Sequence, residues 1–228
     1  MKEEILAQPY AIFDVDGTLL DSMPFWHNMG RDYLKLHGRE AQPDIREVLE
    51  PLSMEESGIF LKRQYGLPET AAQITAGLNE WMAGHYRTDI PARPGVCDYL
   101  TLLAGRGTRM AVATATALPL VEAALVRTGL RPFFTSLVSC DEVGVGKKKP
   151  DVFTLAMKRL GAWPDRKTVI YEDAWFAIRT AKKLGCRVVG VYDADCSVPP
   201  EEVAAYCDAY IRDWRQEKAA ECSPAPEV

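Results

Sequence analysis

Two aspartates one residue apart follow a short apolar run near the start of the chain. The run covers residues 10–13, and its two apolar faces predict a buried strand that leads into Asp14 and Asp16. Near a strand end, this spacing can bring both carboxylates toward one side of the chain. Crowded, buried carboxylates repel each other and lose hydration, and a cation or a shared proton relieves both effects. A bare Asp-x-Asp is more often an Asp-Gly turn, so a functional interpretation depends on partners elsewhere in the chain.

Three later apolar runs are also followed by side chains that can do chemistry. In chain order these are Thr114, Thr116, Lys147, Glu172 and Asp173. Singly, a threonine at a strand end is usually a helix cap, a lysine run is usually a solvated face, and a Glu-Asp pair is usually an N-cap. If the runs are parallel strands, their carboxyl ends meet at the edge of a sheet where ligands bind. Acids, hydroxyls and a lysine gathered there predict a metal-assisted phosphoryl-transfer site.

Strand and helix patterns alternate from residue 96 onward. The expected strands cover residues 10–13, 110–114, 136–139, 168–171, 187–192 and, at an edge, 209–211. The expected helices cover residues 96–104, 118–128, 151–160 and 175–184. This alternation predicts an α/β fold, a Rossmann-like parallel sheet with helices on both faces. The polar tail from Arg215 onward is expected to fray.

Residues 22–90 carry helical patterns alone. Helices are expected over residues 22–38, from a capping box at Ser53 to Gly66, and over residues 69–86. Two prolines and a glycine in residues 91–95 then break regular structure. We therefore expect two domains, an α/β catalytic core of residues 1–21 and 91–228 and an inserted all-helical cap domain of residues 22–90.

Composition limits the partners of the chain. Of its 228 residues, 47% are hydrophobic and 26% are charged, as in soluble globular proteins, and the net charge of -5 argues against nucleic acid as a partner. The amino terminus lacks the apolar core of a signal peptide, and no run is long enough to span a bilayer. The six cysteines form no Cys-x-x-Cys pair, so we expect reduced thiols rather than disulfides or a zinc site. These features predict a cytoplasmic protein without a membrane partner.

Four short motifs stand in order along the chain. They are Asp14-Val15-Asp16-Gly17-Thr18, Thr114, Lys147-Lys148-Lys149-Pro150-Asp151 and Glu172-Asp173-Ala174. With them the sequence resembles the haloacid dehalogenase superfamily, and within it the phosphatase and β-phosphoglucomutase-like branch with a helical cap. Lys148 replaces the usual proline of the third motif, and Ala174 replaces the usual serine of the fourth. The spacing from Pro150 selects Lys147 as the active-site lysine.

The resemblance implies a role for each acid. Asp14 is expected to be the nucleophile that forms an aspartyl-phosphate, and Asp16 the acid that protonates the leaving oxygen and then activates water. The implied cofactor is Mg²⁺, held by Asp14, Asp173 and the backbone carbonyl of Asp16, with Glu172 in support. Dehalogenases of the superfamily lack the second acid of the first motif, so the presence of Asp16 favours ester hydrolysis.

The resemblance also implies a phosphate-binding set. Lys147 and Thr114, with backbone amides near Ala115, are expected to hold the phosphoryl oxygens. The expected enzyme is a Mg²⁺-dependent phosphatase for a small phosphorylated metabolite, with a sugar phosphate as a candidate. We expect a monomer or a weak homodimer.

Three residues of the helical segment are candidate substrate contacts: Trp26, His27 and Met54. Relatives often carry a histidine where Trp26 stands. His27 comes one residue later, so on a helix its side chain points about 100° away from that of Trp26. In residues 51–57, Met54 stands where mutase relatives place an arginine that holds a second phosphate, which favours hydrolysis. Trp26 and Met54 could equally be core residues of the cap. A hexose-phosphate mutase is the alternative hypothesis, and a non-catalytic binding protein on the same fold is a third, against which the intact acids argue.

Overall fold

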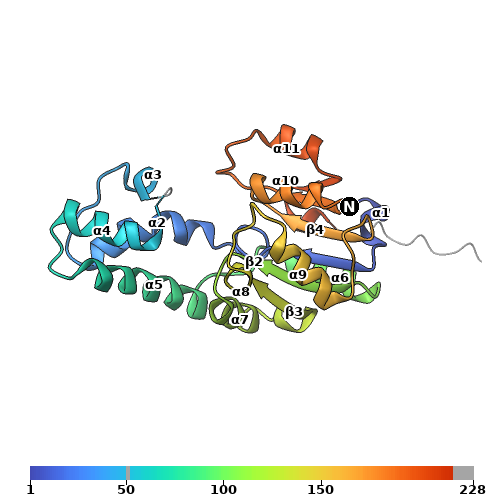
Figure 1. Cartoon of the computed structure of the whole chain (residues 1–228), viewed down its shortest axis with the longest axis horizontal. Coiled ribbons are helices and arrows are strands. Elements are labelled where there is room, and N and C mark those ends of the chain that lie inside the picture. The colour runs from blue at the N-terminus through green and yellow to red at the C-terminus, as the bar shows by residue number, and fades with distance from the viewer. Residues whose placement is uncertain (50–51, 218–228) are drawn as a thin grey trace, which may run out of the picture. The chain divides into compact units, whose positions relative to one another are not determined.

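The computed structural model describes residues 1–49 and 52–217 of the chain. The chain divides into two compact units, one formed by Met1–Asp21 with Pro91–Val228 and the other by Ser22–Ile90 (Figure 1). The larger unit contains the sheet, and the smaller unit is helical. Each unit has its own buried core.

The larger unit is built on six parallel strands in the order β3-β2-β1-β4-β5-β6. The strands are β1 (Tyr10–Phe13), β2 (Arg109–Thr114), β3 (Phe134–Ser139), β4 (Thr168–Glu172), β5 (Arg187–Val191) and β6 (Ala209–Ile211). Strand order reverses between β1 and β4, where Phe13 is the partner of Tyr171. The predicted parallel sheet is confirmed, with β6 at its edge, and its switch point lies beside the first motif.

Helices cover both faces of the sheet. They are α1 (Glu3–Leu6), α6 (Val96–Gly105), α7 (Leu118–Arg127), α8 (Cys140–Val143), α9 (Asp151–Leu160), α10 (Trp175–Lys183) and α11 (Pro200–Tyr206). Successive side chains of a strand point to opposite faces. On one face, Ile12 belongs to an apolar cluster that includes Phe153 of α9 and Ile178 of α10. On the other face, Phe13 stacks on Tyr171 with ring centroids 4.2 Å apart.

The four predicted helices of this unit are present, each within one residue of its expected bounds. Three shorter helices, α1, α8 and α11, were not expected. They contain four, four and seven residues, which is too short for an apolar repeat to be recognised.

The smaller unit contains α2 (Met23–Leu36), α3 (Ile45–Leu49), α4 (Met54–Tyr65) and α5 (Ala71–Thr88). The predicted capping box is present: Ser53 Oγ accepts from the backbone N of Glu56, and the Glu56 carboxylate accepts from the backbone N of Ser53. α5 begins two residues later than expected, because Thr70 caps it through a second capping box with Gln73. Among the described residues of this unit no strand occurs, as predicted.

The prediction that the chain frays from Arg215 onward is wrong for residues 215–217. A 3₁₀ helix, η2, covers Trp214–Gln216, and the Glu217 carboxylate pairs with the amino terminus at 2.7 Å. Residues 218–228, with Cys222, lie outside the described residues, as does Pro51 of the stretch compared with mutases. The other five cysteines are free thiols. In the described part of the chain, no helix combines the length and the apolarity that a membrane crossing requires.

Candidate active site

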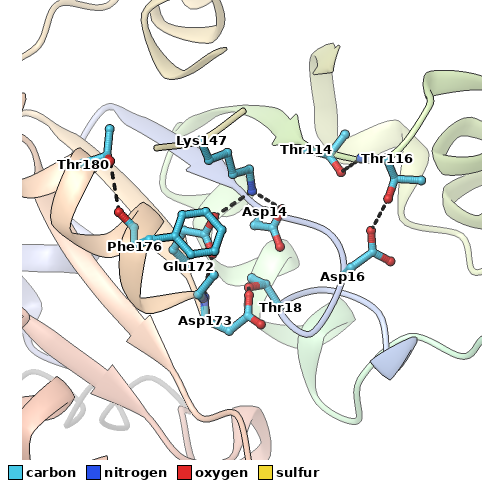
Figure 2. A network of polar contacts seen from close by, with 11 residues as sticks. Asp14, Asp16, Thr18, Thr114, Thr116, Lys147, Glu172, Asp173, Phe176 and Thr180 are labelled. Atoms are coloured by element: carbon cyan, nitrogen blue, oxygen red, sulfur yellow. Dashed lines mark hydrogen bonds and ion pairs between the residues drawn. The ribbon is translucent and has the colours of Figure 1, made fainter. Parts of the chain in front are cut away.

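Three carboxylates meet where strand order reverses. Asp14 follows β1 and continues its ladder, since its backbone N donates to the carbonyl of Tyr171 at 3.0 Å. Glu172 ends β4 and Asp173 comes next, so the parallel register brings all three to one edge of the sheet. Each offers a carboxylate oxygen within 4.8 Å of the others, and all three residues are buried (Figure 2).

Lys147 bridges two of these carboxylates. Its Nζ donates to Asp14 Oδ1 and, at 2.7 Å, to Glu172 Oε1. Lys147 is 5% exposed, whereas Lys148 and Lys149 are exposed. Burial therefore singles out the same lysine that the motif spacing selected; its catalytic role stays a prediction.

Burial sets the protonation of the cluster. Loss of hydration raises the pKa of Asp14 to about 7, with Glu172 and Asp16 adding to the rise and Lys147 opposing it. Burial also raises the pKa of Asp173 well above its ordinary value, and the charges of Glu172 and Asp14 raise it further. For Lys147, burial favours the neutral form, but the two carboxylates outweigh it and the pKa is raised, so the ammonium stays charged.

Asp16 lies apart from this cluster, on the turn that follows Asp14. Its Oδ2 accepts a hydrogen bond of 2.7 Å from Thr116 Oγ1, after the end of β2 (Figure 2). Thr114 is fully buried, and its Oγ1 accepts from the backbone N of Thr116 at 3.0 Å. The backbone at Gly17 has a φ of 79°, a conformation that side chains rarely allow. Ala115 is exposed, just before the start of α7.

Thr18 and Thr116 also join the site; the sequence placed Thr116 among the side chains at the strand ends, but neither residue was given a specific role there. Thr18 Oγ1 is buried and donates to Asp173 Oδ1 at 2.9 Å, across 155 residues of sequence. The motif contained Thr18, but nothing in it indicated the partner. The second oxygen of Glu172 accepts from the backbone N of Asp173 and of Ala174, just before α10. Neither acid caps that helix, because its N-cap is Ala174 and no side chain caps it.

The carboxylate cluster fits a divalent cation. Asp14, Glu172 and Asp173 offer hard oxygen ligands, and Lys147 is the one cation that the structure shows in contact with Asp14 and Glu172 among the described residues. With all three acids ionised the group carries a net charge of about -2, which the raised pKa values of Asp14 and Asp173 show to be unfavourable without a further cation.

The smaller unit has a cavity of about 380 Å³, a size suited to a small organic ligand. Trp26, His27 and Met54, the three candidates from the sequence, all line it. The other apolar side chains that line it are Met23, Met29, Ile45, Leu49 and Leu52, and no acidic side chain lines the cavity in the described part of the unit. Arg46 was not predicted; its guanidinium lies 3.3 Å from His27 Nε2. The guanidinium can only donate, so Nε2 is the acceptor of this contact.

Comparison with known proteins places this geometry in a family context. The profile of the haloacid dehalogenase-like hydrolase family matches residues 11–191. The chain is 32% identical to the fructose-1-phosphate phosphatase YqaB of Escherichia coli over 184 residues, which cover 79% of this chain and 94% of YqaB. It is 25% identical to a phosphorylated carbohydrates phosphatase of Thermotoga maritima over 181 residues, 79% of this chain and 83% of that protein.

A solved structure supports the same relationship. The crystal structure of CbbY from Rhodobacter sphaeroides in complex with phosphate matches this chain with a TM-score of 0.71 and 26% sequence identity. The match covers 92% of this chain and 96% of that one, so both units have counterparts in a single known fold.

Proposed function

The chain belongs to the haloacid dehalogenase-like hydrolase family, and from this premise we propose that it is a Mg²⁺-dependent phosphatase for a small phosphomonoester. It is a hydrolase of the phosphatase type, like the two curated relatives described above. The observation that supports the proposal most is the buried group of Asp14, Glu172 and Asp173, bridged by Lys147 at the switch point of the sheet. Because those relatives are named for phosphorylated carbohydrates, a sugar phosphate is the first substrate class to test.

Asp14 is the proposed nucleophile. One of its carboxylate oxygens attacks phosphorus, the bond to the alcohol oxygen breaks, and Asp16 donates a proton to that leaving oxygen. In the second half-reaction Asp16 takes a proton from water, the water oxygen attacks the aspartyl-phosphate, and Asp14 is regenerated with release of phosphate. The hydrogen bond from Thr116 holds the Asp16 carboxyl in one orientation for both proton transfers.

Asp14, Asp173 and the backbone carbonyl of Asp16 are proposed to hold Mg²⁺, with Glu172 in support. When bound, the ion would offset the repulsion between a carboxylate nucleophile and an anionic phosphate. The hydroxyl of Thr18 keeps Asp173 directed into the cluster. Ala174 offers no hydroxyl there, so the carboxylates are the side-chain ligands of the proposal.

Lys147 and Thr114 are proposed to stabilise the phosphoryl oxygens, with backbone amides near Ala115. The raised pKa of Lys147 keeps it cationic at neutral pH, so it can favour the charge that builds up on phosphoryl oxygens. Thr114 is fixed by its bond to the backbone of Thr116, which orients its hydroxyl.

We further propose that the smaller unit is a cap domain and that Trp26, His27 and Met54 contact the organic part of the substrate. The support is their shared cavity, whose volume suits a small metabolite. Met54 cannot hold a second phosphate group, which favours hydrolysis over a hexose-phosphate mutase reaction.

The decisive experiment measures hydrolysis of an aryl phosphate with Mg²⁺ and after removal of metal by EDTA. We expect turnover that depends on Mg²⁺, and a subsequent screen of phosphorylated metabolites to identify the best substrate. Full activity after EDTA treatment would show that the site needs no metal. Conversion of a hexose phosphate to its isomer without release of phosphate would favour the mutase, and absence of any turnover would favour a binding protein.

A further inference from the structure

The turn of residues 15–20, here called the catalytic turn, is bound through its backbone carbonyls by two residues far away in the sequence. Three successive carbonyls of the turn accept hydrogen bonds from them. The Arg93 guanidinium donates to the carbonyl of Gly17, and the Arg93 backbone N donates to the carbonyl of Leu19 at 2.9 Å. Between these two, the indole Nε1 of Trp214 donates to the carbonyl of Thr18 at 3.2 Å.

Trp214 is fixed by its surroundings. It is 3% exposed, and its ring packs against Tyr99 and Tyr171 at centroid distances of 5.0 and 6.1 Å. Its 3₁₀ helix lies close against Gly95, where an added Cβ would come within 2.6 Å of the backbone N of Arg215. The indole donor therefore has little freedom to leave the carbonyl of Thr18.

Arg93 connects the catalytic turn to the other half of the sheet. Its guanidinium also donates to the carbonyl of Tyr192 at 3.0 Å, directly after β5. The backbone N of Tyr192 in turn donates to the carbonyl of Ile211 in β6. A movement of the turn would break its bonds to both the guanidinium and the backbone N of Arg93.

These contacts bear on the site because the same turn carries two of its side chains. Asp16 projects from the turn toward Thr116, and Thr18 Oγ1 donates to Asp173 while its carbonyl accepts from Trp214. Thr18 thus links the indole to the carboxylate cluster. A displacement of about 1 Å at such groups can lower a rate about 100-fold.

We propose that Trp214 and Arg93 are positioning residues of this enzyme. They hold the catalytic turn so that Asp16 and Thr18 keep their positions relative to Asp173. The inference rests on the proposed function for its catalytic consequence, while the mechanical part stands on the contacts alone. Trp214 lies beyond residues 11–191, the part of the chain matched by the family profile. The hydrogen bond that it donates to the catalytic turn therefore comes from the segment that follows the matched region.

The mechanical part is tested by hydrogen exchange of the metal-free protein, read by mass spectrometry. Trp214→Phe keeps an aromatic ring and removes the indole donor. We expect the amides of Leu19 and Leu20, which donate to the carbonyl of Val15, to exchange about tenfold faster in this variant, with β2 and β5 unchanged. Tyr99→Phe is the matched control, since it removes a hydroxyl from the same aromatic cluster, the one bonded to Tyr171, without touching the turn.

The catalytic part is tested by steady-state kinetics on an aryl phosphate. Trp214→Phe and Arg93→Met should each lower kcat about tenfold and leave KM within about twofold, because the substrate still binds while the reacting groups are misplaced. Arg93→Lys, which keeps a cationic donor, should recover part of the loss. Tyr99→Phe should leave kcat unchanged, even if it lowers the melting temperature.

The outcomes separate the inference from the proposed function. Unchanged exchange in Trp214→Phe and Arg93→Met, or an equal change in Tyr99→Phe, overturns the positioning role. Faster exchange in the turn with unchanged kcat overturns its catalytic consequence. A wild-type protein with no turnover on any phosphate ester overturns the proposed function, while the exchange experiment still decides whether the two residues hold the turn.

Discussion

The carboxyl edge of the sheet and the cavity of the smaller unit differ in how their side chains are held. At the sheet edge, the three clustered acids Asp14, Glu172 and Asp173 are buried, as is Lys147, and hydrogen bonds to Lys147 or to Thr18 hold each of them in place. The cavity is walled mainly by apolar side chains, and among its polar lining residues Arg46 and His27 contact each other. Apolar packing sets the shape of a cavity, whereas a linked polar network sets charge and orientation.

This difference predicts where substitutions matter. A single change at the sheet edge leaves buried charged partners uncompensated and removes a reacting group, so its effect on rate should be large. A single change in the cavity alters volume, so its effect should fall on the choice of substrate and be modest.

The largest effect is expected at Asp14, the proposed nucleophile. Asp14→Asn is nearly isosteric but cannot attack phosphorus, and we expect turnover to fall by about 10⁴-fold or more. Initial rates on an aryl phosphate and intact-mass detection of a phosphorylated protein are the measurements. The wild type should show the covalent phosphate and the variant should not. Substantial turnover in a clean preparation of the variant would contradict the proposed mechanism.

A second large effect is expected at Asp173. Asp173→Ala removes a proposed ligand, so the Mg²⁺ concentration for half-maximal activity should rise about tenfold or more. The same change relieves crowding among buried acids, so in EDTA the variant should melt no lower than wild type. Thermal melts with and without metal provide this check. Equal Mg²⁺ dependence in the two proteins would place the metal elsewhere.

The three consecutive lysines allow a buried and an exposed charge to be compared within a single loop. Lys147→Ala should lower kcat about 100-fold, as expected for the loss of one well-placed contact to the developing charge. Lys148→Ala and Lys149→Ala should each cost less than about tenfold, because both side chains are exposed and their charges are screened. Rate constants of the three variants decide the matter. If Lys148→Ala is the inactive one, the lysine assignment fails while the rest of the mechanism stands.

Substitution of a residue that lines the cavity should change substrate selectivity. Met54→Ala enlarges one wall, so the ratio of kcat/KM for a bulky and a small phosphate ester should change by about tenfold in favour of the bulky one. Leu36→Ala, at an exposed position of α2, is a matched control in the same unit. Loss of kcat with an unchanged ratio would argue that Met54 serves the fold of the unit instead of the substrate.

The smallest effect on catalysis is expected at Asp208, which is part of a charged group at the amino ends of β5 and β6. Partial burial works against its ionised form, but hydrogen bonds from the Val188 backbone, Lys182 and Arg166 outweigh it and lower the pKa of Asp208. Its contribution to stability should therefore be complete above the unfolded pKa of about 3.9 and disappear as pH falls through the lower folded value.

Asp208→Asn tests this contribution. The difference in free energy of unfolding between wild type and variant, measured by urea denaturation across pH, should be constant near neutrality and shrink at acid pH. Turnover should stay unchanged. A difference independent of pH would mean that the ionised form of Asp208 adds nothing to stability.

The sequence by itself determined the fold class and the residue types of the site. Residues 10–13 and 168–171 are short apolar runs, and alternation with helical patterns implies a parallel sheet whose strand ends meet. Asp14, Asp16 and Asp173 could be singled out from local sequence, because each follows a short apolar run and stands in a motif of the family. Helices α1, α8 and α11 could not, because their length gives no periodic signal.

Only the tertiary structure decided how the groups support each other. The bond from Thr18 to Asp173 joins residues 155 apart, and that from Trp214 to Thr18 joins residues 196 apart. Nor did the sequence predict that Arg46 would lie beside His27 at the cavity. Such contacts depend on how distant strands and helices pack and on which way each side chain then points, and local patterns of hydrophobicity carry no information about that geometry.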